Sequence, residues 1–274
     1  MRRRGGRTAS LALGTQLKSL NYYWRLVATG YNFVSFGIGA LIFSLTIMPV
    51  VRLWPGKREQ RAARARQVIH QVFRLFAWQM RMTGVMSVSA NDVHRLRREA
   101  RGRVVIANHP SLIDVILLIS LLPRSGCVVK QAMWRNPLTY GMVQGAGFIS
   151  NASDSATLLA RSKQVLDAGD PLVLFPEGTR TVRGKPVRFQ RGAANIAVRN
   201  NAEILPVVIR NQPPTLSKQE RWYQIPPSKT RYTITPQTPL RIEDVVDTSG
   251  GPALTTRRLN RYLENYYRSI LSDE

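Results

Sequence analysis

His109 and Asp114 are the first pair of side chains in this sequence whose types and spacing could support catalysis. They lie five residues apart in the polar segment NHPSLID, between two apolar runs. On one continuous helix this separation would turn the side chains about 140° apart, so they can meet only if His109 lies in a loop and Asp114 in a first helical turn. Pro110 favours that break, and Ser111 is a suitable N-cap. The pair could be a minimal general base, or a purely structural hydrogen bond.

A second polar turn, FPEGTR, follows another short apolar run. Pro176 and Gly178 predict a tight exit from a strand, which would deliver Glu177 and Arg180 to the carboxyl end of the strand. Open α/β sheets bind ligands at this edge. The Arg180 guanidinium suits a phosphate group, and the Glu177 carboxylate suits a hydroxyl group or the arginine itself. Two such turns in one chain favour a functional site over two unrelated loops.

The sequence lacks the signatures of several other enzyme classes. It contains no GxSxG elbow and no GxxxxGK[ST] loop, and GAGFIS at residues 145–150 lacks the third glycine of a dinucleotide fingerprint. A single cysteine, Cys127, forbids an internal disulfide, and no CxxC or HExxH pattern offers a zinc site. We interpret Cys127, His70 and His94 as structural. We therefore expect no metal and no cofactor, in a thiol-reducing compartment.

The two polar turns carry a resemblance to a known family. NHPSLID matches the HxxxxD motif, and FPEGTR the motif of the same name, of the glycerolipid acyltransferases. The chain resembles the 1-acyl-sn-glycerol-3-phosphate acyltransferase branch of the lysophospholipid acyltransferase superfamily. Residues 145–149, 189–194 and 204–209 resemble further blocks of the family, as does Lys130 after a predicted strand. The resemblance spans about residues 104–209.

The resemblance implies direct attack of a lipid hydroxyl on a fatty acyl thioester, supplied by acyl-carrier protein or by acyl-CoA. His109 would remove the hydroxyl proton, and Asp114 would orient and stabilise His109. The acceptor would be a lysolipid similar to lysophosphatidic acid. The residues expected to bind it are Glu177, Gly178, Thr179 and Arg180.

The sequence departs from the family pattern at one position that bears on the acceptor. Where the family block ends in an arginine thought to contact phosphate, this chain has Ser150. A neutral hydroxyl cannot replace a bidentate cation, so recognition of phosphate would rest on Arg180, with Lys130, Arg188 or Arg191 as substitutes. The acceptor could also be a specialised lipid without that phosphate, such as a lyso-ornithine lipid or an aryl polyene lipid.

The charge of the chain indicates an anionic partner. Forty lysines and arginines against 16 acidic residues give a net charge of +24. Such a surplus attracts anionic membranes, an acidic carrier protein, coenzyme A phosphates or nucleic acid. A non-enzymatic basic protein that binds membrane or nucleic acid would explain the charge but neither polar turn. We therefore expect an enzyme whose partners are an acyl donor, a lysolipid and an anionic membrane surface, and no nucleic acid.

The alternation of short apolar runs with helical stretches predicts the α/β class, a mixed sheet flanked by helices. A proline-rich loop at residues 211–230 is predicted to be a surface excursion. The predicted strands are 104–107, 127–129, 148–149, 172–175, 204–209 and 232–234, and the helices include 115–122, 154–168 and a terminal helix over 259–270.

The N-terminal part has a different character. Residues 26–51 carry no charge and are long enough to cross a bilayer as a helix. A re-entrant hairpin bent at Gly37 and Gly39, or a helix in the membrane interface, fits equally well. Residues 57–82 predict a basic amphipathic helix. We expect membrane-associating helices over residues 1–83 and an acyltransferase domain over 84–274, at the inner (cytoplasmic) membrane with the active site facing the cytoplasm.

Overall fold

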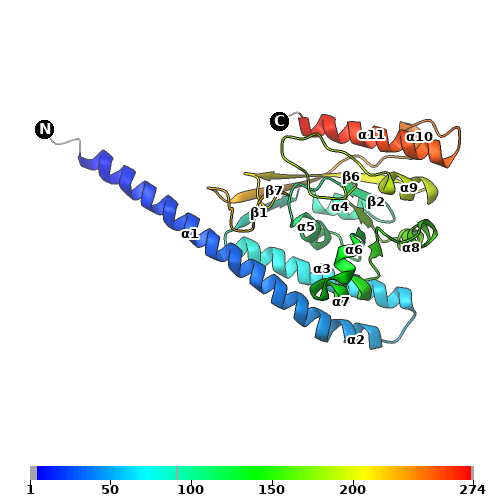
Figure 1. Cartoon of the computed structure of the whole chain (residues 1–274), viewed down its shortest axis with the longest axis horizontal. Coiled ribbons are helices and arrows are strands. Elements are labelled where there is room, and N and C mark those ends of the chain that lie inside the picture. Colours follow the sequence, from blue (N-terminus) through cyan, green and yellow to red (C-terminus); the bar gives the residue numbers. More distant parts are fainter. Residues whose placement is uncertain (1–4, 91, 273–274) are drawn as a thin grey trace.

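A seven-stranded mixed sheet forms the centre of the molecule in the computed structural model, which describes residues 5–90 and 92–272 (Figure 1). The strand order is β1-β7-β6-β2-β5-β3-β4, and all neighbours are parallel except β6 and β7. The predicted fold class is therefore confirmed. The strands are β1 (Met86–Ala90), β2 (Val104–Ala107), β3 (Gly126–Val129), β4 (Ile149–Ser150), β5 (Leu172–Leu174), β6 (Ile204–Gln212) and β7 (Thr230–Pro236).

Alternate residues of the central strands build a separate core on each face of the sheet. In β2, Val105 and Ala107 point into one apolar cluster, whereas Val104 and Ile106 point into the other. All four side chains are fully buried. This is the pattern expected of a strand covered by helices on both sides.

The helices on the first face include the N-terminal part of the chain. Phe43, Met48, Val51 and Ile69 belong to the same apolar cluster as the strands, so these helices share a core with the sheet. The proposed boundary near residue 83 stays a prediction. The helices on this side are α1 (Gly5–Ile42), the π-helical turn η1 (Phe43–Ile47), α2 (Met48–Leu53), α3 (Arg58–Met82), α5 (Asp114–Leu121), α6 (Gln131–Arg135) and α7 (Pro137–Gly145).

The second face is covered by helices from the C-terminal half. The predicted terminal helix is present as α11, Pro252–Ser272, and its Tyr267 hydroxyl donates a hydrogen bond to the Ile106 carbonyl at 2.6 Å. The same oxygen accepts the N–H of Val207 at 3.0 Å, which ties α11 to two central strands. The helices on this side are α8 (Ser155–Asp167), α9 (Gly192–Arg199), α10 (Ile242–Val245) and α11 (Pro252–Ser272). Helix α4 (Val93–Glu99) instead packs its Leu96 into the apolar cluster of the first face.

The uncharged N-terminal segment continues as helix across its glycines. Gly37 and Gly39 lie inside α1, so the alternative of a hairpin bent at these residues is wrong. Residues Ser19–Val51 have the length and composition of a membrane span, with a mean hydropathy of 2.1, and 17% of their most apolar window is buried. The rest of this window is therefore exposed on the surface of the protein.

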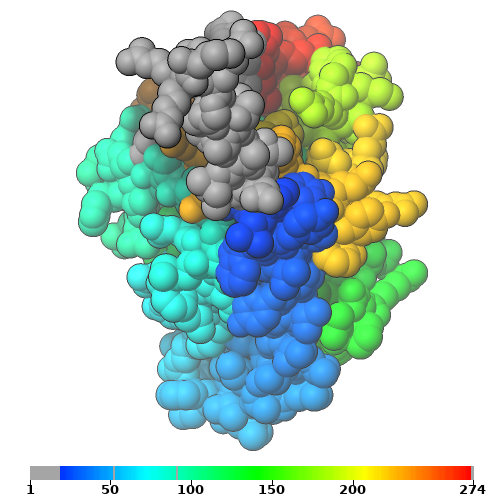
Figure 2. All heavy atoms as spheres, turned by 90° about the vertical axis from the view of Figure 1, so that its left-hand side faces the viewer, coloured from blue at the N-terminus to red at the C-terminus, as the bar shows by residue number. Residues whose placement is uncertain are grey.

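Helices α1 and α3 lie side by side on one face of the molecule (Figure 2). Together they carry a row of exposed apolar side chains. Leu75 of α3 is 63% exposed and belongs to this row. The inner side of α3 is formed by Ile69, Phe73 and Met80. The row, called the apolar band below, comprises Leu20, Trp24, Val27, Tyr31, Val34, Ile38, Leu41 and Leu45 with Leu75, Trp78 and Met82.

Candidate active site

The two polar turns meet at one edge of the sheet because β2 and β5 are parallel neighbours. Ile106 of β2 pairs with Leu174 of β5, so the chain leaves both strands on the same side. NHPSLID follows β2, and FPEGTR follows β5. This is the edge at which open α/β sheets bind ligands.

His109 and Asp114 form the pair that the spacing predicted. His109 lies in the loop, α5 begins at Asp114, and the imidazole Nδ1 is 2.9 Å from the carboxylate Oδ2. The same oxygen accepts the N–H of Ser111 at 2.6 Å. The Asp114 side chain is fully buried, whereas that of His109 is 15% exposed and lines a large cavity. His109 can therefore exchange a proton with a bound molecule while Asp114 holds it from behind.

The environment of Asp114 suits this role. Burial raises the pKa of the Asp114 carboxyl above its ordinary value, and the hydrogen bonds from His109 and from the Ser111 N–H act in the opposite direction. Asp114 also occupies the first turn of α5, where the helix dipole favours negative charge. Because the Asp114 carboxylate is poorly solvated, its attraction to the imidazolium that forms when His109 takes a proton is stronger than it would be in water.

Ser111 does not cap α5, so that prediction is wrong. The N-cap position is Ile113, which makes no side-chain cap hydrogen bond. The Ser111 hydroxyl instead lies 2.9 Å from the hydroxyl of Tyr232 on β7, and both residues are fully buried. Burial raises the pKa of Tyr232, which keeps the phenol neutral. The tyrosine supports the loop from beneath, a contact that no local sequence pattern signals.

Glu177 holds the main chain of His109. Its Oε1 accepts the N–H of His109 at 2.9 Å and the Thr181 hydroxyl at 2.8 Å, and the Thr181 N–H donates to the His109 carbonyl at 2.7 Å. Burial raises the pKa of the Glu177 carboxyl, and the His109 N–H opposes that rise. Glu177 faces this main chain and not the cavity. We propose that Glu177 positions His109, and the acceptor contact expected from the sequence stays a prediction.

The other residues of FPEGTR do reach the cavity. Gly178 has a φ of +64°, a left-handed conformation that favours glycine, and its N–H closes a turn onto Phe175 at 3.0 Å. Gly178, Thr179 and Arg180 all line the cavity. One nitrogen of Arg180, Nη1, donates to the carbonyls of residues 216 and 217 at 3.0 and 2.9 Å. Within the described residues, Nε and Nη2 of the guanidinium make no hydrogen bond and can serve a ligand.

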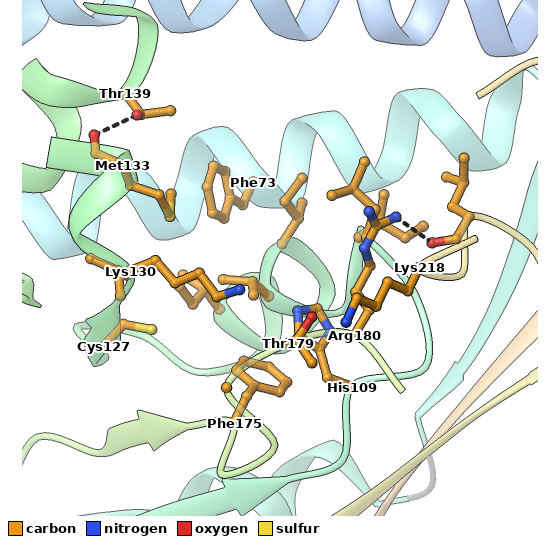
Figure 3. Close-up of a pocket in the computed structure, with 18 of the residues that line it drawn as sticks. Phe73, His109, Cys127, Lys130, Met133, Thr139, Phe175, Thr179, Arg180 and Lys218 are labelled. Atoms are coloured by element: carbon orange, nitrogen blue, oxygen red, sulfur yellow. Dashed lines mark hydrogen bonds between the residues drawn. The ribbon is translucent and has the colours of Figure 1, made fainter. Parts of the chain in front are cut away.

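The cavity has a volume of about 910 Å³ and is mostly apolar. This volume lies near the top of the range of about 300–1,000 Å³ that is usual for small-molecule sites. Figure 3 shows a polar group of His109, Thr179 and Arg180, with apolar side chains extending away from it toward Met133. The apolar lining includes Phe33, Phe36, Phe73, Phe76, Ile116, Ile119, Cys127, Val129, Met142 and Phe148.

The predicted substitutes for the missing arginine differ in placement. Lys130 lines the cavity, whereas Arg188 and Arg191 are exposed and do not. Ser150 also lies outside the lining, and its hydroxyl accepts the N–H of Ala152 at 3.2 Å. A further cation, from the loop after β6, lines the cavity and was not anticipated from the sequence: Lys218.

The remaining titratable groups singled out from the sequence lie apart from this chemistry. Burial raises the pKa of the Cys127 thiol to about 12, so it is an unreactive part of the cavity wall. His70 is buried on α3 with Nδ1 2.8 Å from the Ile119 carbonyl, and burial lowers its pKa. Across the described residues, no three His, Cys, Asp or Glu side chains form a group suited to a metal ion.

Comparisons with known proteins agree with this fold. Residues 88–210 match the family model described as Acyltransferase. The chain is 28% identical to mouse 1-acyl-sn-glycerol-3-phosphate acyltransferase alpha over 54% of this chain and 57% of that protein. It is 33% identical to the Helicobacter pylori 1-acyl-sn-glycerol-3-phosphate acyltransferase over 40% of this chain and 48% of that protein. The matched segments thus span about half the length of these relatives.

A solved structure extends the similarity to nearly the whole chain. The 1-acyl-sn-glycerophosphate (LPA) acyltransferase PlsC from Thermotoga maritima superposes with a TM-score of 0.66 at 18% identity, covering 93% of this chain and 97% of that one. This likeness includes the N-terminal helices and concerns the fold. Residues 88–210 therefore match the acyltransferase family model, and the resemblance seen in the two motifs of that segment is confirmed.

Proposed function

We propose that this protein is a membrane-associated O-acyltransferase that transfers a fatty acyl group from a thioester to the hydroxyl of a lysophosphatidic-acid-like lipid. The observation that carries the proposal is the His109–Asp114 pair, which opens onto a large apolar cavity beside several cationic side chains. A base, an apolar chain site and an anion site are the parts that this reaction needs. The names of the relatives point to the same acceptor.

The reaction proceeds through one tetrahedral intermediate. The acceptor hydroxyl gives its proton to Nε2 of His109, and the resulting oxygen attacks the thioester carbonyl. Asp114, bonded to Nδ1, stabilises the imidazolium. Collapse of the intermediate forms the new ester and breaks the C–S bond, and the leaving thiolate takes the proton back from His109. No side chain of the protein becomes acylated.

The apolar part of the cavity suits the fatty acyl chain of the donor. Phe73 and Phe76 of α3, with Ile116 and Ile119 of α5, form an apolar wall next to His109. Burial of each methylene of the chain contributes about 0.8 kcal/mol. The donor is acyl-carrier protein or acyl-CoA. The +24 charge of the chain favours either of these acidic partners.

The apolar band supports attachment to a membrane through one face of the molecule. Side chains such as Val27, Leu45 and Trp78 are more than half exposed and would lie in the acyl region of a bilayer. Trp24 also exposes its ring while its indole N–H donates to the Thr83 carbonyl at 3.0 Å. We propose the inner membrane with the active site on the cytoplasmic side, where the thioester donors are made available.

The experiment is an acyl-transfer assay with purified protein in anionic vesicles. Lysophosphatidic acid is offered with acyl-CoA or acyl-carrier protein, and a lyso-ornithine lipid is offered in parallel. Mass spectrometry of the products should show phosphatidic acid as the main new lipid. Acylation of the ornithine lipid alone would favour the alternative acceptor, which was considered because Ser150 replaces the arginine of the family pattern. Absence of any acylated lipid with either donor would contradict the proposed function.

A further inference from the structure

The loop over residues 213–229, between β6 and β7, forms one wall of the cavity. Thr215, Leu216, Lys218, Ile225 and Pro226 of this loop all line it. The sequence prediction of a surface excursion is correct for the exposed residues of the loop. Its inner residues, however, belong to the active-site region, because they hydrogen-bond to the His109 loop at Leu112 and to α1 at Arg25. The loop lies beside α1 in Figure 2.

Three hydrogen bonds fix the start of this loop. Arg180 donates from Nη1 to the carbonyls of Leu216 and Ser217, and the N–H of Leu112 donates to the Leu216 carbonyl at 3.1 Å. Leu216 is buried and has a φ of +54°. A bulky residue keeps this left-handed conformation only where its surroundings impose it, and such strain is concentrated at functional sites. The residue that follows this pinned pair is Lys218.

A second clamp fixes the far end of the loop. Arg25 of α1 is 3% exposed, and its guanidinium donates to the carbonyls of Pro226, Pro227 and Ser228 at 2.9, 2.7 and 3.0 Å. Between the two clamps, Trp222 packs against Phe33 of α1 with ring centroids 6.0 Å apart. The loop is therefore held at both ends and along its length, so the position of Lys218 is defined by the fold.

The ammonium groups of Lys218 and Lys130 approach the polar end of the cavity from opposite sides, with His109 and Thr179 between them (Figure 3). Arg180 lines the cavity as well. Both lysines are exposed at the cavity. Among the hydrogen bonds and ion pairs of the described residues, neither ammonium has a protein partner. Arg180, in contrast, already commits one nitrogen to the loop. Two cations without protein partners beside the catalytic base are suited to an anion on the bound substrate.

We infer that Lys218 binds the phosphate of the acceptor lipid and supplies the charge that is missing at Ser150. This inference rests on the proposed function and adds a residue outside both sequence motifs. A phosphate monoester carries close to two negative charges at neutral pH and takes several charge-assisted hydrogen bonds, which Arg180, Lys130 and Lys218 can donate together. The same chemistry is present in the phosphates of coenzyme A, so the test must separate acceptor from donor.

The test compares Lys218→Gln with the wild type and with Lys229→Gln. Lys229 lies in the same loop and is also exposed, but it does not line the cavity, so it controls for net charge. Steady-state constants are measured for lysophosphatidic acid, for 1-monoacylglycerol with the same chain, and for the acyl donor. Lys218→Gln should raise KM for lysophosphatidic acid roughly 10- to 100-fold, the range of one charge-assisted hydrogen bond. Lys218→Arg should retain most of the affinity.

The phosphate-free acceptor and the donor decide the assignment. Turnover of 1-monoacylglycerol and KM for the donor should change less than about twofold in Lys218→Gln, and Lys229→Gln should match the wild type. A KM for lysophosphatidic acid within twofold of wild type would overturn this inference and leave the proposed function standing. So would an equal loss on both acceptors, or a change confined to the donor. A wild-type protein unable to acylate lysophosphatidic acid would overturn the proposed function as well.

Discussion

Replacement of Glu177 by alanine distinguishes a positioning residue from an acceptor-binding residue. In the structure its carboxylate accepts hydrogen bonds from the His109 N–H and the Thr181 hydroxyl, at 2.9 and 2.8 Å. Hydrogen bonds to a charged group contribute about 1.5–3 kcal/mol each, and the substitution leaves the His109 N–H without its partner. If the transition state loses the stabilisation of one such hydrogen bond, kcat falls roughly 10- to 100-fold, because about 1.4 kcal/mol of activation free energy corresponds to a factor of ten in rate.

The assay measures kcat and the acceptor KM separately, in vesicles, for Glu177→Ala, Glu177→Gln and Glu243→Ala. Glutamine keeps an oxygen for the His109 N–H, so most activity should remain. Glu243 is exposed on α10, so its replacement controls for the loss of one negative charge. We expect Glu177→Ala to lower kcat and to leave the acceptor KM within about twofold of wild type. A raised KM with unchanged kcat would show that Glu177 binds the acceptor and would refute its placement behind His109.

Three further predictions follow from the same structure. Asp114→Asn should lower kcat roughly 10²- to 10⁴-fold, because the amide cannot stabilise the imidazolium of His109; activity near wild type would contradict the role of Asp114. Val27→Glu combined with Trp78→Glu should weaken binding in vesicle flotation, whereas Leu254→Glu, an exposed apolar position on α11, should not; equal binding by all variants would exclude the apolar band as the docking face. Burial raises the pKa of the Glu177 carboxyl above 4.5, so its contribution to the free energy of unfolding is present below that pH and should be lost as pH rises through the folded-state pKa. Urea titrations should therefore show the free energy of unfolding of the wild type falling with pH relative to that of Glu177→Gln. The same pH dependence in both proteins would contradict this prediction.

The sequence was sufficient to predict that His109 and Asp114 pair, because the constraint on them is local. Pro110 interrupts the helix, and only one arrangement lets His109 and Asp114 meet over five residues, which is the arrangement in the structure. The central strands were also predictable, since a run such as Val104–Ala107 is apolar on both faces. The short strand β1, Met86–Ala90, was missed, because its mixture of serine and apolar residues gives a weak pattern at the edge of the sheet.

Contacts between distant segments could not be read from local patterns. Glu177 was assigned to the acceptor because the motif suggested it, but its partner is a main-chain N–H 68 residues away. Lys218 lies in a loop without regular periodicity, and it reaches the site only through the clamps from Arg25 and Arg180. Likewise, Ser111 has the residue type of an N-cap, but its hydroxyl forms a hydrogen bond with the hydroxyl of Tyr232 on β7. In each case tertiary contacts decided the role of the side chain.

The most direct test of the central claim is phosphatidic acid formation by His109→Ala and wild-type protein in the same vesicles. The substrates are lysophosphatidic acid and a labelled acyl thioester, and equal binding of both proteins to the vesicles serves as the control for folding and attachment. Since His109 acts through proton transfer, we expect wild-type protein to form phosphatidic acid and His109→Ala to be slower by roughly 10²- to 10⁴-fold. A His109→Ala protein within a few fold of wild type would contradict the account.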